Sequence, residues 1–152
     1  MLKIKVIIVT IASPIVIGLY RDGVLFKTQT LDGQASESLA PFFRDLMQNY
    51  DIEAIAYTNG PGSFMAIKLG YLFFKTLQIV KNIDLYGIDG FYFNNNKPIK
   101  AIGKMVFVKE GNDIVMQKVD GVLPSASYIL PSNWHQEDFF KQNEPLYIVP
   151  AV

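Results

Sequence analysis

The sequence contains no cysteine, and its only histidine is His135. Without cysteine, disulfides and thiolate metal sites are excluded, which fits a reducing compartment, and we expect the chain to be cytoplasmic. A histidine-based metal site needs several ligands at suitable spacing, and the sequence has no paired-histidine helix motif. We therefore expect no metal, no bound cofactor, and a surface position near the start of a helix for His135.

Charged residues are scarce and balanced. Fourteen basic and fourteen acidic side chains cancel, and they make up 18% of the chain, whereas soluble domains usually carry about a quarter. The lysines are scattered, so the basic stripe of an autonomous nucleic-acid-binding protein is missing. Half of the residues are hydrophobic. Apolar surface beyond the needs of one small core tends to mark an interface, and we expect an obligate partner.

The apolar run over residues 6–20 is too short to span a bilayer. It is interrupted by Thr10, Ser13 and Pro14, and it is rich in β-branched residues. Two buried strands separated by a turn explain this pattern better than a signal peptide does. We expect no association with a membrane.

The spacing of apolar and turn residues predicts an α/β domain. The predicted strands cover residues 2–10, 15–20, 24–31, 52–57 and 85–88, and the predicted helices cover residues 39–50 and 64–81. Asp22 and Gly23 form the turn between the second and third strands, because both tolerate positive φ. Ser36 or Ser38 is expected to cap the first helix, and Ser63 the second.

This order of elements begins with a β-meander and continues with crossover helices, which predicts a mixed sheet. The arrangement is typical of the ribonuclease H-like core that actin-like ATPases (the ASKHA fold) repeat in each half. We expect residues 1–90 to form this lobe and residues 91–152 to form a much reduced second lobe, packed with the first as one unit. The second region predicts a hairpin over 100–109 and 114–119, an irregular segment over 124–145 with a short helix near 136–141, and an edge strand over 146–149.

The second predicted helix is apolar over roughly two-thirds of its circumference. Lys68, Tyr71, Lys75 and Gln78 share the remaining narrow stripe. A helix that packs on one sheet face needs an apolar arc only a little wider than 100°. Either this helix is wedged inside its own domain, or its second face docks on another chain. We favour docking, with Ala66 and Gly70 allowing close approach of another helix, through an interface of Phe64, Ala66, Leu69, Gly70, Phe73 and Leu77.

A tight turn of Gly60, Pro61, Gly62 and Ser63 precedes this helix. A junction of strand, glycine turn and helix can bind phosphate on the free N–H groups of the helix. This one lacks the Lys-Ser/Thr ending of a P-loop and the glycine spacing of a dinucleotide-binding fold. We interpret the four residues as a structural turn.

The same segment carries a family resemblance. Residues 57–70 read Tyr-Thr-Asn-Gly-Pro-Gly-Ser-Phe-Met-Ala-Ile-Lys-Leu-Gly, which closely resembles the Gly-Pro-Gly-Ser-Phe-Thr-Gly-Leu-Arg-Ile-Gly signature of the TsaB (YeaZ) family. Residues 36–41, Ser-Glu-Ser-Leu-Ala-Pro, look like the family's Ser-Glu-x-Leu-Leu-Pro at the start of its first helix. The resemblance covers about residues 1–90.

The resemblance implies a role in making N6-threonylcarbamoyladenosine in tRNA. Members of this family have the actin-like fold but are not the catalyst. They pair with TsaD, the subunit that holds metal and transfers threonylcarbamoyl to tRNA, and the ATPase TsaE joins the pair. Pairing uses helices of the N-terminal lobe, and many members also self-associate. By this resemblance we add Phe43 and Met47 of the first helix to the expected interface, and we expect contact with tRNA only through the complex.

The sequence departs from the family pattern where a nucleotide site would be. Members usually have Ile-Asp-Thr at the end of the first strand, whereas residues 9–11 are Val-Thr-Ile, and Ala35 stands where a histidine is common. We expect no catalytic residues and a non-catalytic scaffold subunit. Two alternatives remain, a homodimeric binding module and a residual nucleotide-binding actin-like protein. A ribonuclease H-type nuclease is disfavoured, because the first strand has no aspartate for its metal ions.

Overall fold

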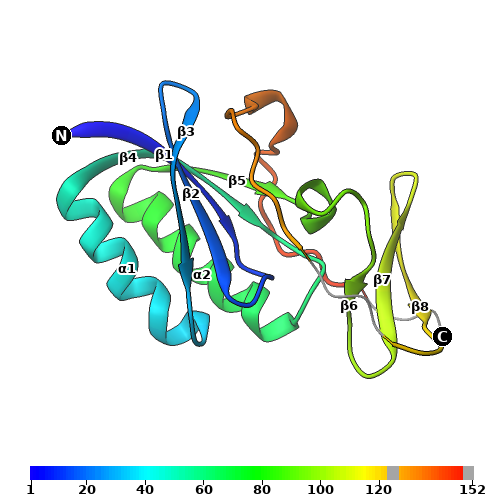
Figure 1. The fold of residues 1–152 in the computed structure, drawn as a ribbon. Helices are drawn as coiled ribbons and strands as arrows, with labels where there is room; N and C mark the ends of the chain where they lie inside the picture. The colour runs from blue at the N-terminus through cyan, green and yellow to red at the C-terminus, as the bar shows by residue number, and fades with distance from the viewer. Residues whose placement is uncertain (123–126, 149–152) are drawn as a thin grey trace.

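The computed structural model describes residues 1–122 and 127–148, and its centre is a five-stranded mixed sheet (Figure 1). The strands are β1 (Leu2–Val9), β2 (Ile15–Arg21), β3 (Val24–Leu31), β4 (Tyr50–Thr58) and β5 (Asp84–Ile88), in the order β3-β2-β1-β4-β5. β1, β2 and β3 pair antiparallel as a meander, whereas β4 pairs parallel with both β1 and β5. This topology confirms the predicted ribonuclease H-like class.

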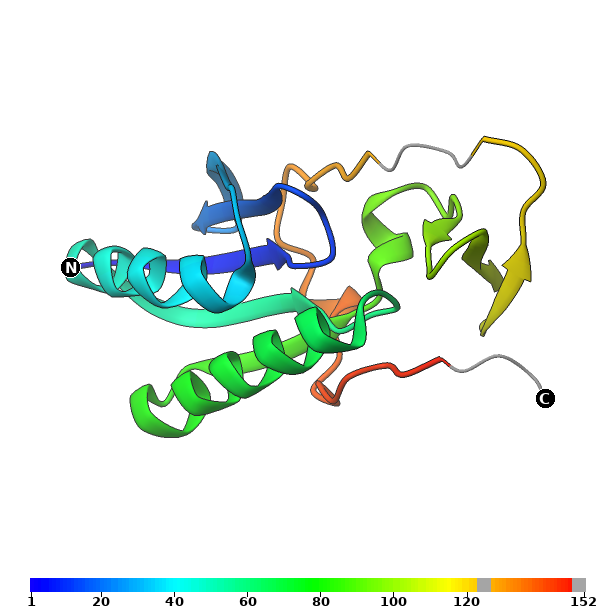
Figure 2. The same ribbon diagram turned by 90° about the horizontal axis from the view of Figure 1, so that it is seen from below.

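Two helices cover one face of this sheet (Figure 2). α1 (Ala35–Asn49) joins β3 to β4, and α2 (Phe64–Lys81) joins β4 to β5. Parallel neighbours need such crossover connections because a hairpin cannot join them. The core beneath the helices is aromatic: the ring of Phe74 lies 5.6 Å from that of Phe43 and 5.3 Å from that of Tyr57. All three side chains are fully buried.

The other face of the sheet is covered by the part of the chain that follows β5. This part includes the 3-10 turns η1 (Gly90–Phe93) and η2 (Gln136–Asp138). Phe93 and Phe139 pack with Ile7 of β1 in a second buried cluster. Burying both faces explains why β1 and β4 are almost wholly apolar near their carboxyl ends.

A small antiparallel sheet lies beyond the carboxyl ends of β4 and β5 (Figure 1). It contains β6 (Ile99–Lys100), β7 (Met105–Glu110) and β8 (Asp113–Lys118). Its Phe107 packs with Phe91 and Ile99 in a third buried cluster. The hairpin expected in this region is therefore present, with a first strand that starts later than the sequence predicted.

Several local predictions were wrong. α1 begins at Ala35 rather than Leu39, its N-cap is Gln34, and neither Ser36 nor Ser38 caps it. Instead the Ser38 hydroxyl donates to the carbonyl of Gln34 at 2.9 Å, the competing bond that serine makes to the preceding turn.

Ser63 does occupy the N-cap position of α2, but its side chain makes no capping hydrogen bond. The helix expected near residues 136–141 is only the three-residue η2, and residues 146–148 form no strand. Residues 124–126 of the expected irregular segment and Val149 of the expected edge strand lie outside the described residues.

Candidate partner interface

The residues predicted to form the interface divide by burial. Phe43, Gly70 and Leu77 are buried inside the chain's own core, so a partner docking from outside cannot reach them. A Cβ added at Gly70 would lie 3.7 Å from both Phe74 and Thr10, which means that Gly70 faces the sheet rather than another helix. Gly70 and Leu77 are buried because the arc of α2 that packs on the sheet is centred near Phe74, and Phe43 is buried on the corresponding face of α1, so these three predicted interface residues are corrected.

The other predicted residues remain accessible to different degrees. Phe64 is exposed, whereas Ala66, Leu69, Phe73 and Met47 are half-buried. Phe73 and Met47 also pack against the core beneath the helices. Of the predicted set, Phe64 and Leu69 therefore offer the most suitable apolar surface, and the interface itself remains a prediction.

The outward face of α2 carries large apolar side chains that the sequence analysis did not assign to an interface. Met65 is 65% exposed, Leu72 51%, Ile79 74% and Val80 69%. Met65, Leu69, Leu72, Thr76 and Ile79 follow one another at alternating steps of four and three residues, and we call these five residues the outer stripe. This spacing is that of a helix seam that packs against another helix.

Thr76 is the only polar member of the outer stripe. Its hydroxyl donates to the carbonyl of Leu72 at 2.7 Å, so it needs no partner outside the helix. The outer stripe is therefore an apolar strip whose polar atom is already satisfied. In the sequence, the only sign of the outer stripe is its alternating spacing of four and three residues. The buried residues Ile67, Gly70, Phe74 and Leu77 have the same kind of spacing on another side of the helix.

An apolar hollow lies at the amino end of the outer stripe. Phe64, Met65, Lys68 and Tyr147 line a hollow of about 370 Å³. The rings of Phe64 and Tyr147 meet edge to face, with centroids 5.3 Å apart. Residues that contribute most to association usually fill hollows of this kind. The segment that follows η2 thus extends the apolar surface of α2 at one end.

The glycine turn before α2 is closely surrounded by protein. Gly60 has φ of +131°, and a Cβ there would lie 2.8 Å from the carbonyl oxygen of Leu146. A Cβ at Gly62 would lie 2.9 Å from Ile11. The N–H of Leu146 also donates to the carbonyl of Asn59 at 2.7 Å. The positive φ and these close contacts account for glycine at both positions, as a structural turn requires.

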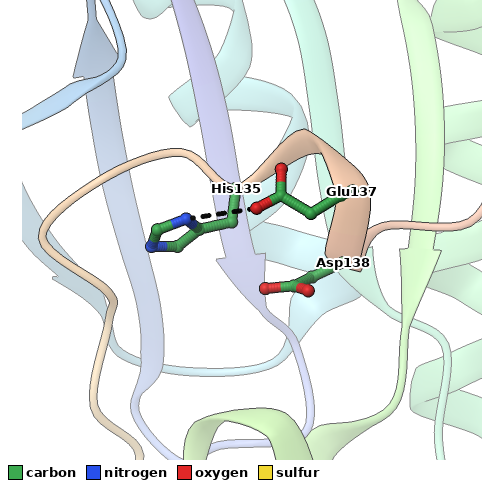
Figure 3. Close-up of side chains that lie close together, drawn as sticks. All are labelled: His135, Glu137 and Asp138. Carbon is green, nitrogen blue, oxygen red and sulfur yellow. Dashed lines mark ion pairs between the residues drawn. The ribbon is translucent and has the colours of Figure 1, made fainter.

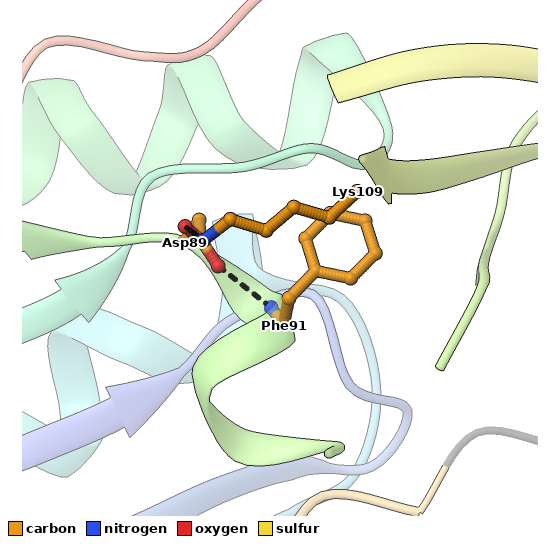
Figure 4. A network of polar contacts seen from close by, with 3 residues as sticks. All are labelled: Asp89, Phe91 and Lys109. Atoms are coloured by element: carbon orange, nitrogen blue, oxygen red, sulfur yellow. Dashed lines mark hydrogen bonds and ion pairs between the residues drawn. The ribbon is translucent and has the colours of Figure 1, made fainter. Parts of the chain in front are cut away.

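An ion pair links the end of β5 to the small sheet (Figure 4). Lys109 Nζ lies 2.8 Å from Asp89 Oδ2, and the backbone N–H of Phe91 donates to Asp89 Oδ1 at 3.0 Å. The Asp89 side chain is only 16% exposed. One oxygen of this carboxylate therefore links β5 to the small sheet through Lys109, and the other caps the first turn of η1.

One group of three potential metal ligands lies in the described part of the chain, at η2 (Figure 3). The ligand atoms of His135, Glu137 and Asp138 lie within 4.8 Å of one another. Glu137 is 74% exposed and lies 3.6 Å from His135 Nδ1. Asp138 Oδ2 accepts a 2.7 Å hydrogen bond from Tyr92. Burial, and then this hydrogen bond, raise the pKa of Tyr92, so the phenol stays a proton donor.

Metal ligands are usually held in place by surrounding hydrogen bonds, and Glu137 has no such support beyond His135. We assign no metal to this group. The sequence predicts a surface position near the start of a helix for His135, and the approach of Glu137 and Asp138 follows only from the turn of η2. Among the described residues, no helix combines the length and the hydropathy that crossing a bilayer requires.

The chain was compared with protein families, with curated proteins and with solved structures. Residues 33–94, which span α1, β4, α2 and β5, match the family model of TsaD, tRNA N6-adenosine threonylcarbamoyltransferase. No curated protein sequence matches the chain.

Among solved structures, YeaZ from Pseudomonas aeruginosa aligns with a TM-score of 0.58 and 15% identity over 89% of this chain and 73% of its own. A protein described as uncharacterized with similarity to peptidase YEAZ, also from Pseudomonas aeruginosa, aligns with a TM-score of 0.54 and 14% identity over 99% of this chain and 85% of its own. The chain therefore has the fold of YeaZ, of the actin-like and ribonuclease H-like type, and its segment from α1 to β5 is similar in sequence to TsaD.

Proposed function

We propose that the chain is a non-catalytic subunit that binds a TsaD-type partner and supports it in the synthesis of N6-threonylcarbamoyladenosine on tRNA. The observation that carries this proposal is the exposed outer stripe of α2. It lies within residues 33–94, the segment similar to TsaD. The YeaZ fold and the resemblance of residues 57–70 to the TsaB signature give further support.

The titratable groups of the chain favour a supporting role over catalysis. β1 (Leu2–Val9), the central strand, has no carboxylate. Asp89, at the carboxyl end of β5, is held by Lys109 and the N–H of Phe91. A metal-dependent transferase site would need a set of free ligands at this end of the sheet, where parallel α/β sheets bind their substrates.

The apolar area on α2 is suited to an interface that extends beyond the outer stripe. Burying a side chain such as Leu72 completely contributes about 1.5–3 kcal/mol, and the exposed members of the stripe are already part-buried. Association costs about 4–15 kcal/mol in lost freedom. The outer stripe alone therefore balances this cost only in part, so we expect the hollow at Phe64 and Tyr147 to take part as well.

A supporting subunit of this kind acts by population shift. A subunit that binds the active conformation of its partner more tightly than the inactive one raises the fraction of active partner. The chain then needs no reactive group of its own. In this proposal the ATPase TsaE joins the same assembly, and the chain contacts tRNA only as part of the complex.

The nucleotide-binding alternative receives little support from the geometry. Gly60 and Gly62 pack closely against Leu146 and Ile11, which is the environment of a structural turn. The neighbouring pocket of about 400 Å³ has Asp89 and Glu144 but no lysine or arginine among its lining residues, so it offers no cation to a phosphate. A homodimer through α2 remains the stronger alternative, because it would use the same outer stripe.

The test is the light-scattering mass of the chain alone and mixed with the TsaD-type protein of the same genome. We expect a mixed species, lost in Leu72→Glu and retained in Gln48→Glu, which adds the same charge to the exposed face of α1. Separate elution of the two wild-type proteins would contradict the proposal. A mixed species that Leu72→Glu leaves intact would show that the outer stripe is not the binding surface.

A further inference from the structure

The charges on α2 all have one sign. The helix carries Lys68, Lys75 and Lys81 and no aspartate or glutamate. Lys68 and Lys75 are one helical repeat of seven residues apart, and each directly precedes a member of the outer stripe, Leu69 and Thr76. They therefore form a row along one flank of the stripe. The opposite flank carries Ala66, Phe73 and Val80, which are uncharged.

These two lysines have no carboxylate partner among the described residues. The four ion pairs found there join Arg21 to Asp22, Arg44 to Asp45, Lys109 to Asp89 and His135 to Glu137. Lys68 is exposed and Lys75 half-buried. Their ammonium groups are thus available to a molecule that covers the outer stripe.

Charges that flank a helix seam determine which partner and which orientation are accepted. If α2 paired antiparallel with α2 of a second copy, the two-fold axis would bring the lysine rows of both copies to the same side of the seam. If it paired parallel, each lysine row would face the apolar flank of the other copy. Because α2 contains no carboxylate, neither arrangement supplies an acidic partner.

We propose that the outer stripe of α2 selects a helix from a different protein, one that carries carboxylates opposite Lys68 and Lys75, and that the lysine row disfavours pairing with α2 of a second copy. This inference rests on the proposed use of the outer stripe as an interface. It goes further by stating the chemistry of the partner: an amphipathic helix with an apolar seam and acidic residues along one flank. Like charges at a seam act against the wrong partner, and opposite charges favour the right one.

The charge dependence separates this inference from simple apolar docking. At 0.15 M salt, exposed charges are screened beyond about 8 Å, so a contribution from Lys68 and Lys75 falls as salt rises. Burial of the outer stripe does not weaken in this way. Affinity for the partner should therefore be higher at 50 mM than at 500 mM salt, and the dependence should disappear when the lysines are replaced.

The experiment uses the double variant Lys68→Glu and Lys75→Glu. Its matched control is Lys104→Glu and Lys118→Glu, two exposed lysines of the small-sheet region that give the same change in net charge. Calorimetric titration of the TsaD-type protein should show about tenfold weaker binding for the α2 variant at 50 mM salt and unchanged binding for the control. Equal affinities of the α2 variant and the wild type at 50 mM salt would overturn the inference.

A second measurement needs no partner protein. In the antiparallel arrangement, which brings the two lysine rows together, glutamates of the variant would face lysines of the wild type. The light-scattering mass of an equimolar mixture of the two chains should therefore exceed that of either chain alone. Leu72→Glu in both chains should abolish the increase. A wild-type chain that forms a dimer on its own, dissociated by Leu72→Glu, would overturn the inference. So would a mixture whose mass equals that of its components.

The two measurements distinguish the possible failures. If the wild-type chain does not bind the TsaD-type protein, the proposed function fails, and the mixing experiment still decides whether the lysine row controls pairing at α2. Circular dichroism of each variant should give the wild-type melting temperature within about 2 °C, because surface substitutions usually change the free energy of unfolding by no more than about 0.5 kcal/mol.

Discussion

α1 and α2 lie side by side on the same face of the sheet, yet their outward faces differ in kind. The outward face of α1 is polar, with Glu37, Arg44, Asp45, Gln48 and Asn49 exposed. The outward face of α2 exposes Met65, Leu72, Ile79 and Val80, and the only charged residues of this helix are lysines. A helix packed on a sheet needs an apolar arc only a little over 100° wide, and α1 shows that this chain can meet that need with a polar outer surface. The fold therefore does not require the extra apolar surface of α2, which is the surface that we propose for partner binding.

The largest effect is expected where both helices share one buried contact. Phe43 of α1 is fully buried and lies against Phe42, Phe73 and Phe74. Phe43→Ala should lower the free energy of unfolding by about 3–5 kcal/mol, because a large cavity replaces the ring. Urea unfolding measures this. A loss below about 1 kcal/mol would mean that the interface between the helices is not packed as described.

A pair of substitutions on α2 compares its two faces directly. Leu77 is 8% exposed and Leu72 51% exposed. Leu77→Ala should cost about 2–5 kcal/mol of unfolding free energy, and Leu72→Ala less than about 1 kcal/mol in the isolated chain. If both variants lose equal stability in urea, Leu72 is covered in the free chain, and the contrast between the two helices disappears.

The smallest expected effect has the opposite sign. Gly70 is helical, and a Cβ at this position would meet Phe74 and Thr10 at the ordinary contact distance of 3.7 Å. Gly70→Ala should therefore raise the free energy of unfolding by about 0.5–1 kcal/mol, through better helix propensity and a less flexible unfolded chain. Thermal unfolding followed by circular dichroism would detect the gain. A loss of stability would show that α2 lies closer to the sheet than the structure indicates.

The sequence predicted the elements of the fold well because their signals are local. Alternating or continuous apolar residues mark the strands, and the glycine turn before α2 separates two long periodic segments. The start of α1 was missed because Ser38 uses its hydroxyl within the helix instead of capping it. Residues 146–148 were predicted as a strand from their apolar composition, but a strand also requires a hydrogen-bonded neighbour, and these residues have no ladder partner.

The candidate interface was predicted only in part, for a different reason. When about two-thirds of a helix is apolar, the sequence alone cannot choose which arc faces the sheet. Gly70 and Leu77 were assigned outward and lie inward, whereas Leu72 and Ile79 lie outward. Only the tertiary structure fixes this rotation, because both arcs have a helical repeat of apolar residues.

The absence of cysteine from the sequence allows the central claim to be tested by labelling at single sites. Leu72→Cys places a thiol on the outer stripe of α2, and Gln48→Cys places one on the exposed face of α1. The measurement is the rate of alkylation by iodoacetamide with and without a saturating amount of the TsaD-type protein. We predict that the partner slows alkylation at position 72 and leaves position 48 unaffected. Equal rates at position 72 with and without the partner, or protection of position 48 instead, would contradict the assignment of α2 as the partner interface.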